Sequence, residues 1–332
     1  MTRPWTLALP TLSALMFASC GVVSLVASPE PGAPDSPIAK IGTIDTDTVE
    51  TSPVVVGGKL YRFESVREGY HANATGVPYF HLIDVETGEA TPAFAQRHAL
   101  GSAYVEDDTM YVFGVPGWGT AQINVFSSSD LVHWEEHVAL DLPGWELYNT
   151  SVCQTEDGYV MAFEVGGPAE VAGQPFTARF ARSADLIHWE LLPEPAVYTK
   201  QKYSACPTIR WSDGWYYMTH LEAIGGYRFE THIVRSRDLV AWESSTRNPV
   251  ITFDETDKTL ASEHLTPEQV EEIRGALNRN NSDIDYIEFE GQVVIYYSWG
   301  DQVGNEFLAQ AVFDGTMDEF FAFYFPQERE SE

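Results

Sequence analysis

Cationic side chains are scarce in this sequence, in which 19 Lys and Arg stand against 49 Asp and Glu and give a formal net charge of −30. A surface with that balance repels nucleic-acid phosphates and anionic lipid headgroups. We therefore expect no nucleic-acid partner, and contact with a membrane only through a lipid anchor. Solubility is the simplest role for such a charge, and we expect a monomer.

Cysteine is also rare, with three residues in 332. Cys20 lies close to the N-terminus, so Cys153 and Cys206 alone remain for the rest of the chain. No spacing of Cys and His matches a zinc site. An oxidising compartment would permit one disulfide, and two buried free thiols are an equal alternative.

The sequence has no apolar run at its N-terminus long enough to cross a bilayer. The stretch from Trp5 to Phe17 follows the single cation Arg3 and has the length of a signal peptide. It ends in FASC at residues 17–20, which resembles a bacterial lipobox with Cys20 as the lipidated residue. Ordinary signal cleavage nearby is the alternative.

These features divide the chain into four segments. We expect a lipoprotein-type signal segment at 1–20, a Pro-rich tether at 21–44, one folded domain at 45–326 and an acidic tail at 327–332. The protein is accordingly expected to be exported, as an outer-membrane, cell-surface or periplasmic lipoprotein, and otherwise to be secreted.

What the sequence does contain is an internal repeat. The pattern S-x-D-L-x-x-W occurs at 128–134, 183–189 and 236–242, with its aspartates 55 and 53 residues apart. A period near 50 residues, with β-branched and aromatic runs after turn glycines, is typical of propeller blades. The 282 residues of 45–326 accommodate five such units. The sequence therefore predicts an all-β fold: a five-bladed β-propeller of four-stranded antiparallel blades.

Two local elements complete this prediction. Ser and Asp of the repeat are expected to hold a tight turn, while its Leu and Trp pack between blades. One inserted helix is expected at about 267–278, because Thr266-Pro267-Glu268-Gln269 forms a capping box with Pro at the first helical position. We expect this helix to lie over the active face.

The blade period, the repeat and the strand 206–210 before Asp213-Gly214-Trp215 together resemble glycoside hydrolase family 43 and its five-bladed relatives, families 32 and 117. The resemblance covers about residues 45–326 and implies hydrolysis of glycosidic bonds by carboxylates on the innermost strands. Aligned on the turn glycines, the acid positions of family 43 fall on Glu50, Thr150 and either Ala205 or Cys206. Only Glu50 therefore carries over.

Other acids recur where second strands should end, at Glu64, Glu164 and Glu222, and where the inner strand of blade five should begin, at Asp283 and Asp285. First strands begin and second strands end at the same rim of a propeller. The two aspartates alternate, so both should point to one side of their strand. Each glutamate could instead be a solvated loop end, but together these acids predict one pocket on the axis.

Glycoside hydrolysis requires one protonated and one ionised carboxyl. We expect Glu222 to be the acid, because an apolar strand precedes it and desolvation should raise its pKa, and Asp283 to be the ionised partner. Glu64 is expected to orient substrate or tune its neighbours, with Glu164 as the fourth catalytic candidate. The candidate substrate-binding residues are Asp285, Asn149, Tyr203, Trp299, His220 and Glu50.

The sequence thus predicts a glycoside hydrolase acting on a poly- or oligosaccharide. Two alternatives remain open: a non-catalytic carbohydrate-binding or sensing propeller lipoprotein, and a polysaccharide lyase. A hydrolase of this kind requires no cofactor. A divalent cation such as calcium at the centre of the propeller is a further alternative.

Overall fold

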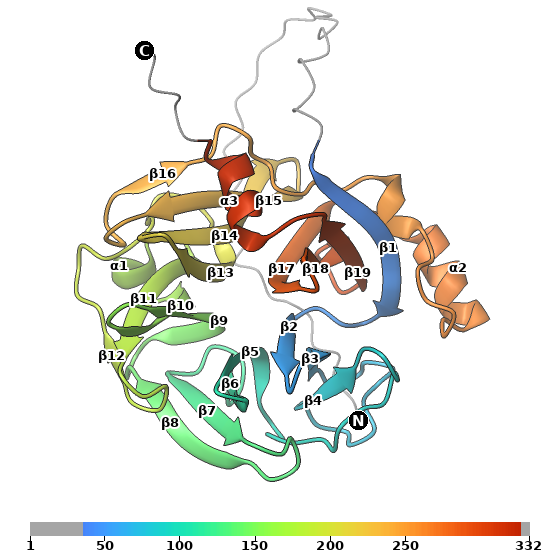
Figure 1. Ribbon diagram of the computed structural model, residues 1–332, viewed down its shortest axis with the longest axis horizontal. Coiled ribbons are helices and arrows are strands. Elements are labelled where there is room, and N and C mark those ends of the chain that lie inside the picture. Colours follow the sequence, from blue (N-terminus) through green and yellow to red (C-terminus); the bar gives the residue numbers. More distant parts are fainter. Residues whose placement is uncertain (1–35, 327–332) are drawn as a thin grey trace, which may run out of the picture.

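A computed structural model describes residues 36–326 and confirms the five-bladed propeller (Figure 1). Blade one has three strands rather than the four expected. Each blade is an antiparallel sheet that begins at the axis. The strands are, in blade one, β2 (Thr51–Val56), β3 (Lys59–Val66) and β4 (Tyr79–Asp84); in blade two, β5 (Ala99–Glu106), β6 (Thr109–Val115), β7 (Gln122–Ser128) and β8 (Glu135–Asp141); in blade three, β9 (Glu146–Thr155), β10 (Gly158–Gly167), β11 (Thr177–Ser183) and β12 (Trp189–Leu191); in blade four, β13 (Ala205–Ser212), β14 (Trp215–Gly225), β15 (Arg228–Ser236) and β16 (Trp242–Ser244); and in blade five, β17 (Asn280–Phe289), β18 (Gln292–Gly300), β19 (Glu306–Phe313) and β1 (Ile38–Thr46).

Blade five is completed from the other end of the chain. Strand β1 pairs antiparallel with β19, from Ile38 opposite Phe313 to Thr46 opposite Phe307. The expected domain start at residue 45 is therefore wrong, because most of this strand falls in the segment assigned to the tether. The signal segment, Cys20 and the acidic tail 327–332 lie outside the described residues.

The repeat forms the corner between the third and fourth strands of blades two, three and four. In blade three, Ser183 Oγ accepts from the backbone NH groups of Asp185 and Leu186, and Asp185 Oδ1 accepts from those of Ile187 and His188. Trp189 Nε1 donates to the Leu186 carbonyl at 2.9 Å. The scaffold role expected for this motif is confirmed.

Three α-helices accompany the blades: α1 (Ala169–Ala172), α2 (Pro267–Gly275) and α3 (Met317–Tyr324). The capping box of α2 forms as predicted, with Thr266 and Gln269 exchanging hydrogen bonds. The helix lies outside blade five beside β1 (Figure 1), where Gln269 Nε2 donates to Thr46 Oγ1 at 2.8 Å. Its expected position over the active face is wrong, and α1 and α3 were not predicted.

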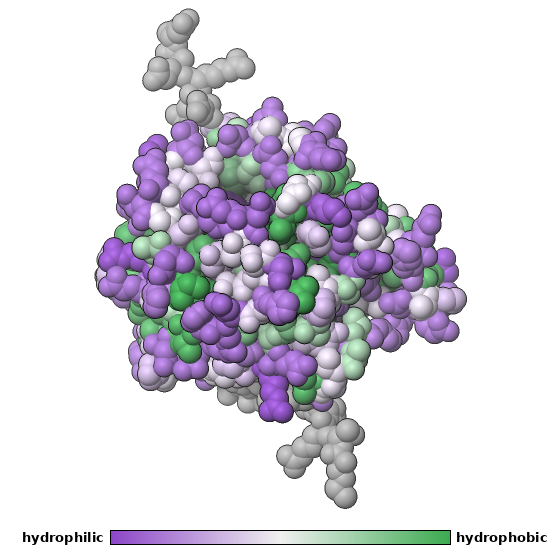
Figure 2. All heavy atoms as spheres, turned by 60° about the horizontal axis from the view of Figure 1, so that its bottom comes forward, coloured by the Kyte–Doolittle hydropathy of each residue, from purple (hydrophilic) through white to green (hydrophobic). Residues whose placement is uncertain are grey.

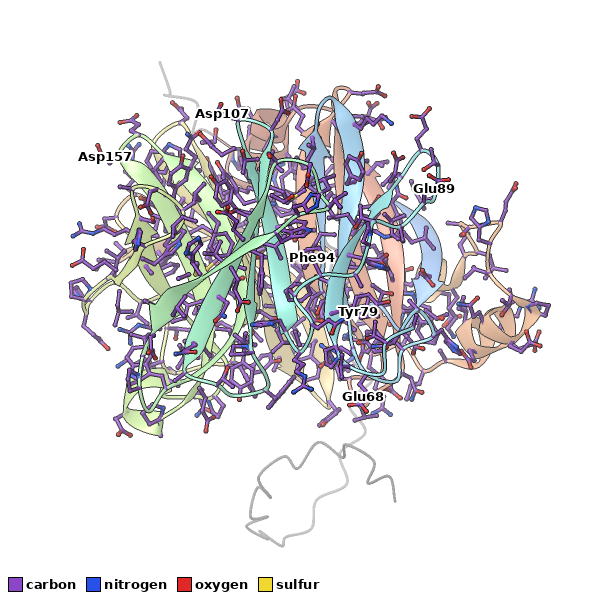
Figure 3. The ribbon with its side chains drawn as sticks, turned by 90° about the horizontal axis from the view of Figure 1, so that it is seen from below. Glu68, Tyr79, Glu89, Phe94, Asp107 and Asp157 are labelled. Carbon is purple, nitrogen blue, oxygen red and sulfur yellow. The ribbon has the colours of Figure 1, made fainter. Side chains whose placement is uncertain are left out.

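The two ends of the axis differ (Figure 3). At the upper face, hairpin turns carrying Asp107 and Asp157 join first strands to second strands. Helix α3 also packs there, with Phe321 stacked on Tyr217 at 3.9 Å. At the lower face, first strands begin and second strands end, and Glu68 follows β3 there.

The blades pack through aromatic side chains. Phe63, Phe80 and Phe113 are fully buried, and a Cβ on Gly114 would come within 2.5 Å of the Phe80 ring. The outer surface of blades one and two is mostly hydrophilic (Figure 2). Within residues 36–326, no helix is both long and apolar enough to cross a membrane. Cys153 and Cys206 are free thiols.

Candidate active site

The innermost strands are distorted close to the lower face. The pairing register shifts between Ala99 and Ser102, between Ala205 and Thr208, and between Ser282 and Asp285. Inside these shifts, Leu100, Cys206 and Asp283 have φ of 55°, 51° and 49°, values uncommon for residues other than glycine. Bulges of this kind re-aim side chains next to active sites. The residues that these shifts bring to the axis are Gly101 and Ser102 in blade two, Cys206 in blade four and Asp283 in blade five.

A hollow of about 30 Å³ lies on the axis between these strands. Its polar lining contains two buried acceptors, Glu50 Oε2 and Asn149 Oδ1, that have no hydrogen-bond partner among the described residues. Unpaired buried acceptors are costly, and a hydroxyl-rich ligand or water would satisfy them. The lining side chains and glycine are Glu50, Thr51, Ser52, Gly101, Ser102, Asn149, Thr150, Cys206, Pro207, Thr208, Asp283, Ile284 and Asp285.

Glu50 enters the hollow from blade one and forms an ion pair with Arg67. Burial raises the pKa of Glu50, Arg67 opposes that rise, and the charge of Asp283 adds to it. Arg67 follows β3, and the sequence analysis did not identify it.

Glu164, toward the end of β10 in blade three, does not itself line the hollow but is hydrogen-bonded to two residues that do. Its Oε2 accepts from the Cys206 backbone NH at 2.7 Å and from Asn149 Nδ2 at 3.3 Å. Burial nevertheless raises the pKa of Glu164 to about 7, with further contributions from Asp283 and Glu50. This carboxyl therefore retains its proton close to neutral pH.

Asp283 is half-buried and lies between these groups. Ser298 Oγ donates to its Oδ2 at 3.3 Å. Burial raises the pKa of the Cys206 thiol well above its ordinary value, and Asp283 is the next largest cause. Burial also raises the pKa of Glu306 to about 8, again with Asp283 as the next cause. Asp283 thus contributes to the raised pKa of both neighbours, Cys206 and Glu306. Glu306 was not identified from the sequence.

Asp285 also lines the hollow, as expected, but it is already paired. Its Oδ1 accepts from Arg210 of blade four and from its own neighbour's NH, that of Tyr286. The simple alternation argument does not explain the placement of Asp283 and Asp285, because the register shift lies between Ser282 and Asp285.

Glu64 does not line the hollow. It is 2% exposed, with Arg62 Nη2 at 2.6 Å and His81 Nε2 at 2.6 Å. Although burial acts to raise it, these two groups lower the pKa of Glu64 to about 2. Arg62 lies over the ring of Tyr296, so this cluster faces blade five rather than the axis.

Glu222 is likewise absent from the lining of the hollow, and the expected rise in its pKa is wrong. His220, whose Nε2 lies 3.4 Å from Oε2, lowers the pKa of Glu222 to about 2, and Lys202, whose Nζ lies at 2.7 Å, lowers it further. Desolvation is outweighed by these two partners. His220 is 1% exposed and contacts Glu222 rather than the hollow.

The remaining substrate-binding candidates divide in two. Asn149 lines the hollow, and Tyr203 lies near it, since Cys206 and Glu164 help burial to raise its pKa. Trp299 is 0% exposed, stacks on Phe307 at 4.5 Å and donates from Nε1 to Thr43 Oγ1 at 2.8 Å. Trp299 is therefore not available to bind substrate as expected, because no face of its ring is free.

In the part of the chain that the structure describes, no group of three or more His, Cys, Asp and Glu is arranged to hold a metal ion. The paired states of Glu50 with Arg67 and Asp285 with Arg210 are consistent with that finding. A central calcium ion therefore gains no support from these side chains.

The sequence matches no protein-family model, and no match was found among curated proteins. Solved structures do match. A thermostable family-43 glycoside hydrolase aligns with a TM-score of 0.59 and 11% identity over 81% of this chain and 90% of its own. A protein described as a glycoside hydrolase aligns at 0.57 and 13%, over 82% and 91%. A xylan β-1,4-xylosidase from Bacillus halodurans aligns at 0.54 and 14%, over 84% of this chain and 55% of that one. At these identities the likeness shows the fold, which is that of the family-43 propellers.

Proposed function

We propose that this protein is a glycoside hydrolase whose reacting carboxyls stand at the lower end of the propeller axis. The observation that carries the proposal is that Glu50 of blade one and Asp283 of blade five line one hollow. Glu164 of blade three stands directly behind its lining, hydrogen-bonded to the lining residues Asn149 and Cys206. Glycosidic cleavage requires one protonated and one ionised carboxyl, and burial raises the pKa of Glu164 to about 7.

Glu164 is the proposed general acid, in place of Glu222. Burial holds its pKa at about 7, so that it can donate a proton to the leaving oxygen near neutral pH. The Cys206 NH and Asn149 fix the position of its Oε2. Asp283 is the proposed ionised partner, which either activates water or attacks the sugar carbon.

Glu50 and Arg67 are proposed to position the substrate. Arg67 occupies Oε1 of Glu50, which leaves the unpaired Oε2 to accept from a sugar hydroxyl. The hollow has about the volume of one water molecule. A sugar ring must therefore lie across its mouth, with only one hydroxyl or water entering.

The test uses two leaving groups. An aryl glycoside with a strongly acidic phenol leaves without protonation, whereas an oligosaccharide needs an acid. We expect Glu164→Gln to reduce kcat/KM on oligosaccharides by about 10²–10⁴-fold and to affect the activated aryl glycoside far less. Pentosides are the first substrates to try, since one structural neighbour is described as a xylosidase. Glu156→Gln is the matched control, because Glu156 is exposed in the turn between β9 and β10.

Equal losses on both substrate types would remove Glu164 from the acid role. Products that absorb in the ultraviolet would indicate a polysaccharide lyase instead.

A non-catalytic carbohydrate-binding propeller is the second candidate. One observation favours it. Family 43 carries acids at three positions, and in this chain two of the three are occupied by Thr150 and by either Ala205 or Cys206. In that case calorimetry would detect binding of an oligosaccharide that the protein leaves intact over long incubation.

A further inference from the structure

Six aromatic rings form an arc on the lower face that the proposed chemistry does not use. Each ring centroid lies between 5.2 and 6.1 Å from the next, mostly in edge-to-face geometry. We call this set the aromatic arc; its members, in spatial order, are Trp118, Tyr148, Phe176, Tyr203, Phe229 and Tyr227.

Chain connectivity places the aromatic arc on the lower face. Trp118 follows β6, a second strand, and Tyr148 lies near the start of β9, a first strand. Tyr203 precedes β13, and Tyr227 lies in the turn between β14 and β15. Second strands end and first strands begin at this face. The arc therefore runs from blade two, across blade three, to blade four.

The ends of the aromatic arc are open to solvent. Trp118 is 54% exposed and Tyr227 is 44% exposed, and no other Phe, Tyr or Trp in residues 36–326 is exposed. The buried Tyr148 and the half-buried Phe176, Tyr203 and Phe229 join these two exposed ends. A continuous aromatic strip that reaches the surface of a soluble protein marks a binding surface. Because both exposed rings belong to the same arc, chance scatter does not account for them.

The backbone holds this arrangement in place. Gly117 and Gly119 flank Trp118 with φ of 150° and 64°, conformations that favour glycine. A Cβ on Gly166 would come within 2.6 Å of the Tyr148 ring. The ring of Tyr148 therefore rests on bare backbone and supports the edge of Trp118 at 5.2 Å.

The middle of the aromatic arc borders the axial carboxyls. Burial raises the pKa of Tyr203 well above its ordinary value, and Cys206, Glu164 and Asp283 add to that rise. Tyr148, the second ring of the arc, directly precedes Asn149, which lines the hollow and donates to Glu164 Oε2 at 3.3 Å. A ligand that covers the arc would lie beside the hollow and Glu164.

We propose that the aromatic arc binds an extended, uncharged glycan chain and guides it past the axial carboxyls, so that the substrate is a polysaccharide rather than a free disaccharide. This inference rests on the proposed function for the site that the chain reaches. Aromatic ring faces suit the apolar faces of sugar rings. The net charge of −30 disfavours an anionic chain in the same position.

The experiment measures binding of soluble neutral polymers (arabinan, xylan and galactan) and of anionic polygalacturonate by affinity electrophoresis and calorimetry. The background is Glu164→Gln, so that the chain is not cut. Trp118→Ala and Tyr227→Ala should each weaken binding of the retained neutral polymer about tenfold. Trp118→Phe, which keeps a ring, should restore most of that loss. Leu277→Ala is the control, since Leu277 is 52% exposed and lies outside the arc.

Two results would overturn the inference: polymer binding that neither alanine variant weakens beyond the Leu277→Ala control, or retention of polygalacturonate with no retention of the three neutral polymers. Failure of the proposed function looks different. There the alanine variants still weaken binding, but the wild-type protein cleaves neither polymer nor aryl glycoside. A third measurement tests the arc in an active enzyme, by comparing kcat/KM on polymer with kcat/KM on an aryl glycoside. If Trp118→Ala leaves that ratio unchanged, the role of the aromatic arc is refuted and the proposed hydrolase function is not.

Discussion

Replacing Glu164 by Gln should change how the stability of the protein depends on pH. Burial raises the pKa of Glu164 from its ordinary 4.5 to about 7, and the side chain is 3% exposed. In the unfolded chain it ionises near 4.5, whereas in the folded protein it keeps its proton up to about 7. The stability tied to that proton is fully present below pH 4.5 and is lost as the pH rises through about 7.

The size of the effect follows from the interval between these two values. At about 1.4 kcal/mol per pH unit, the span from 4.5 to about 7 corresponds to about 3 kcal/mol. Gln cannot ionise, so it lacks this pH-dependent loss while keeping a polar side chain of similar size. The free energy of unfolding of Glu164→Gln, relative to wild type, should therefore rise by about 3 kcal/mol between about pH 4 and pH 8.

Urea unfolding of both proteins at several pH values measures this difference. Subtracting wild type from variant removes the titration of the other acids, apart from their coupling to Glu164 through Asp283 and Glu50. Glu156→Gln, exposed on the upper face, should give a difference that stays nearly constant with pH. If the Glu164→Gln difference is equally constant, Glu164 is ionised like an ordinary surface acid and the assignment of the general acid fails.

Further predictions concern activity, role and location. The kcat/KM on oligosaccharides should fall as the pH rises above about 7, because Glu164 then loses the proton it donates; a rate still rising at pH 9 would argue against this. Glu222→Gln should leave kcat/KM within a few-fold of wild type but lower the midpoint of thermal unfolding, because Lys202 and His220 lose their partner; a loss of turnover equal to that of Glu164→Gln would restore Glu222 as a catalytic candidate. Cys20→Ser should move the protein from the membrane fraction to the soluble fraction when expressed in bacteria, and unchanged fractionation would contradict the lipid anchor.

The fold was predictable because the repeat carries its own local physics. Ser183 and Asp185 close the corner with four hydrogen bonds to nearby backbone NH groups, so the pattern identifies a blade wherever it occurs. Strand β1 has no such signal. It pairs with β19 across the whole length of the chain, and a partner that remote is not specified by any local motif. The position of α2 beside β1 depends on the same long-range pairing.

The site was harder to predict because equivalent positions have different neighbours. Glu64, Glu164 and Glu222 all follow the apolar part of a second strand, which made them alike in the sequence. Arg62 and His81 lower the pKa of the first to about 2, His220 and Lys202 do the same for the third, and burial without a cationic partner raises the second to about 7.

Some of those partners could have been read from the sequence. Arg62 and His220 stand two residues before Glu64 and Glu222, and two residues along a strand is the same side of the sheet. The corresponding residue before Glu164 is Ala162, which offers no charge. Of these three acids, the one with the raised pKa is therefore the one whose strand places no Arg or His on the same side. By that criterion the local sequence already separates Glu164 from Glu64 and Glu222. The position of the Glu164 carboxyl near the hollow is not local, because it depends on the Cys206 NH, which a bulge in blade four turns toward Glu164.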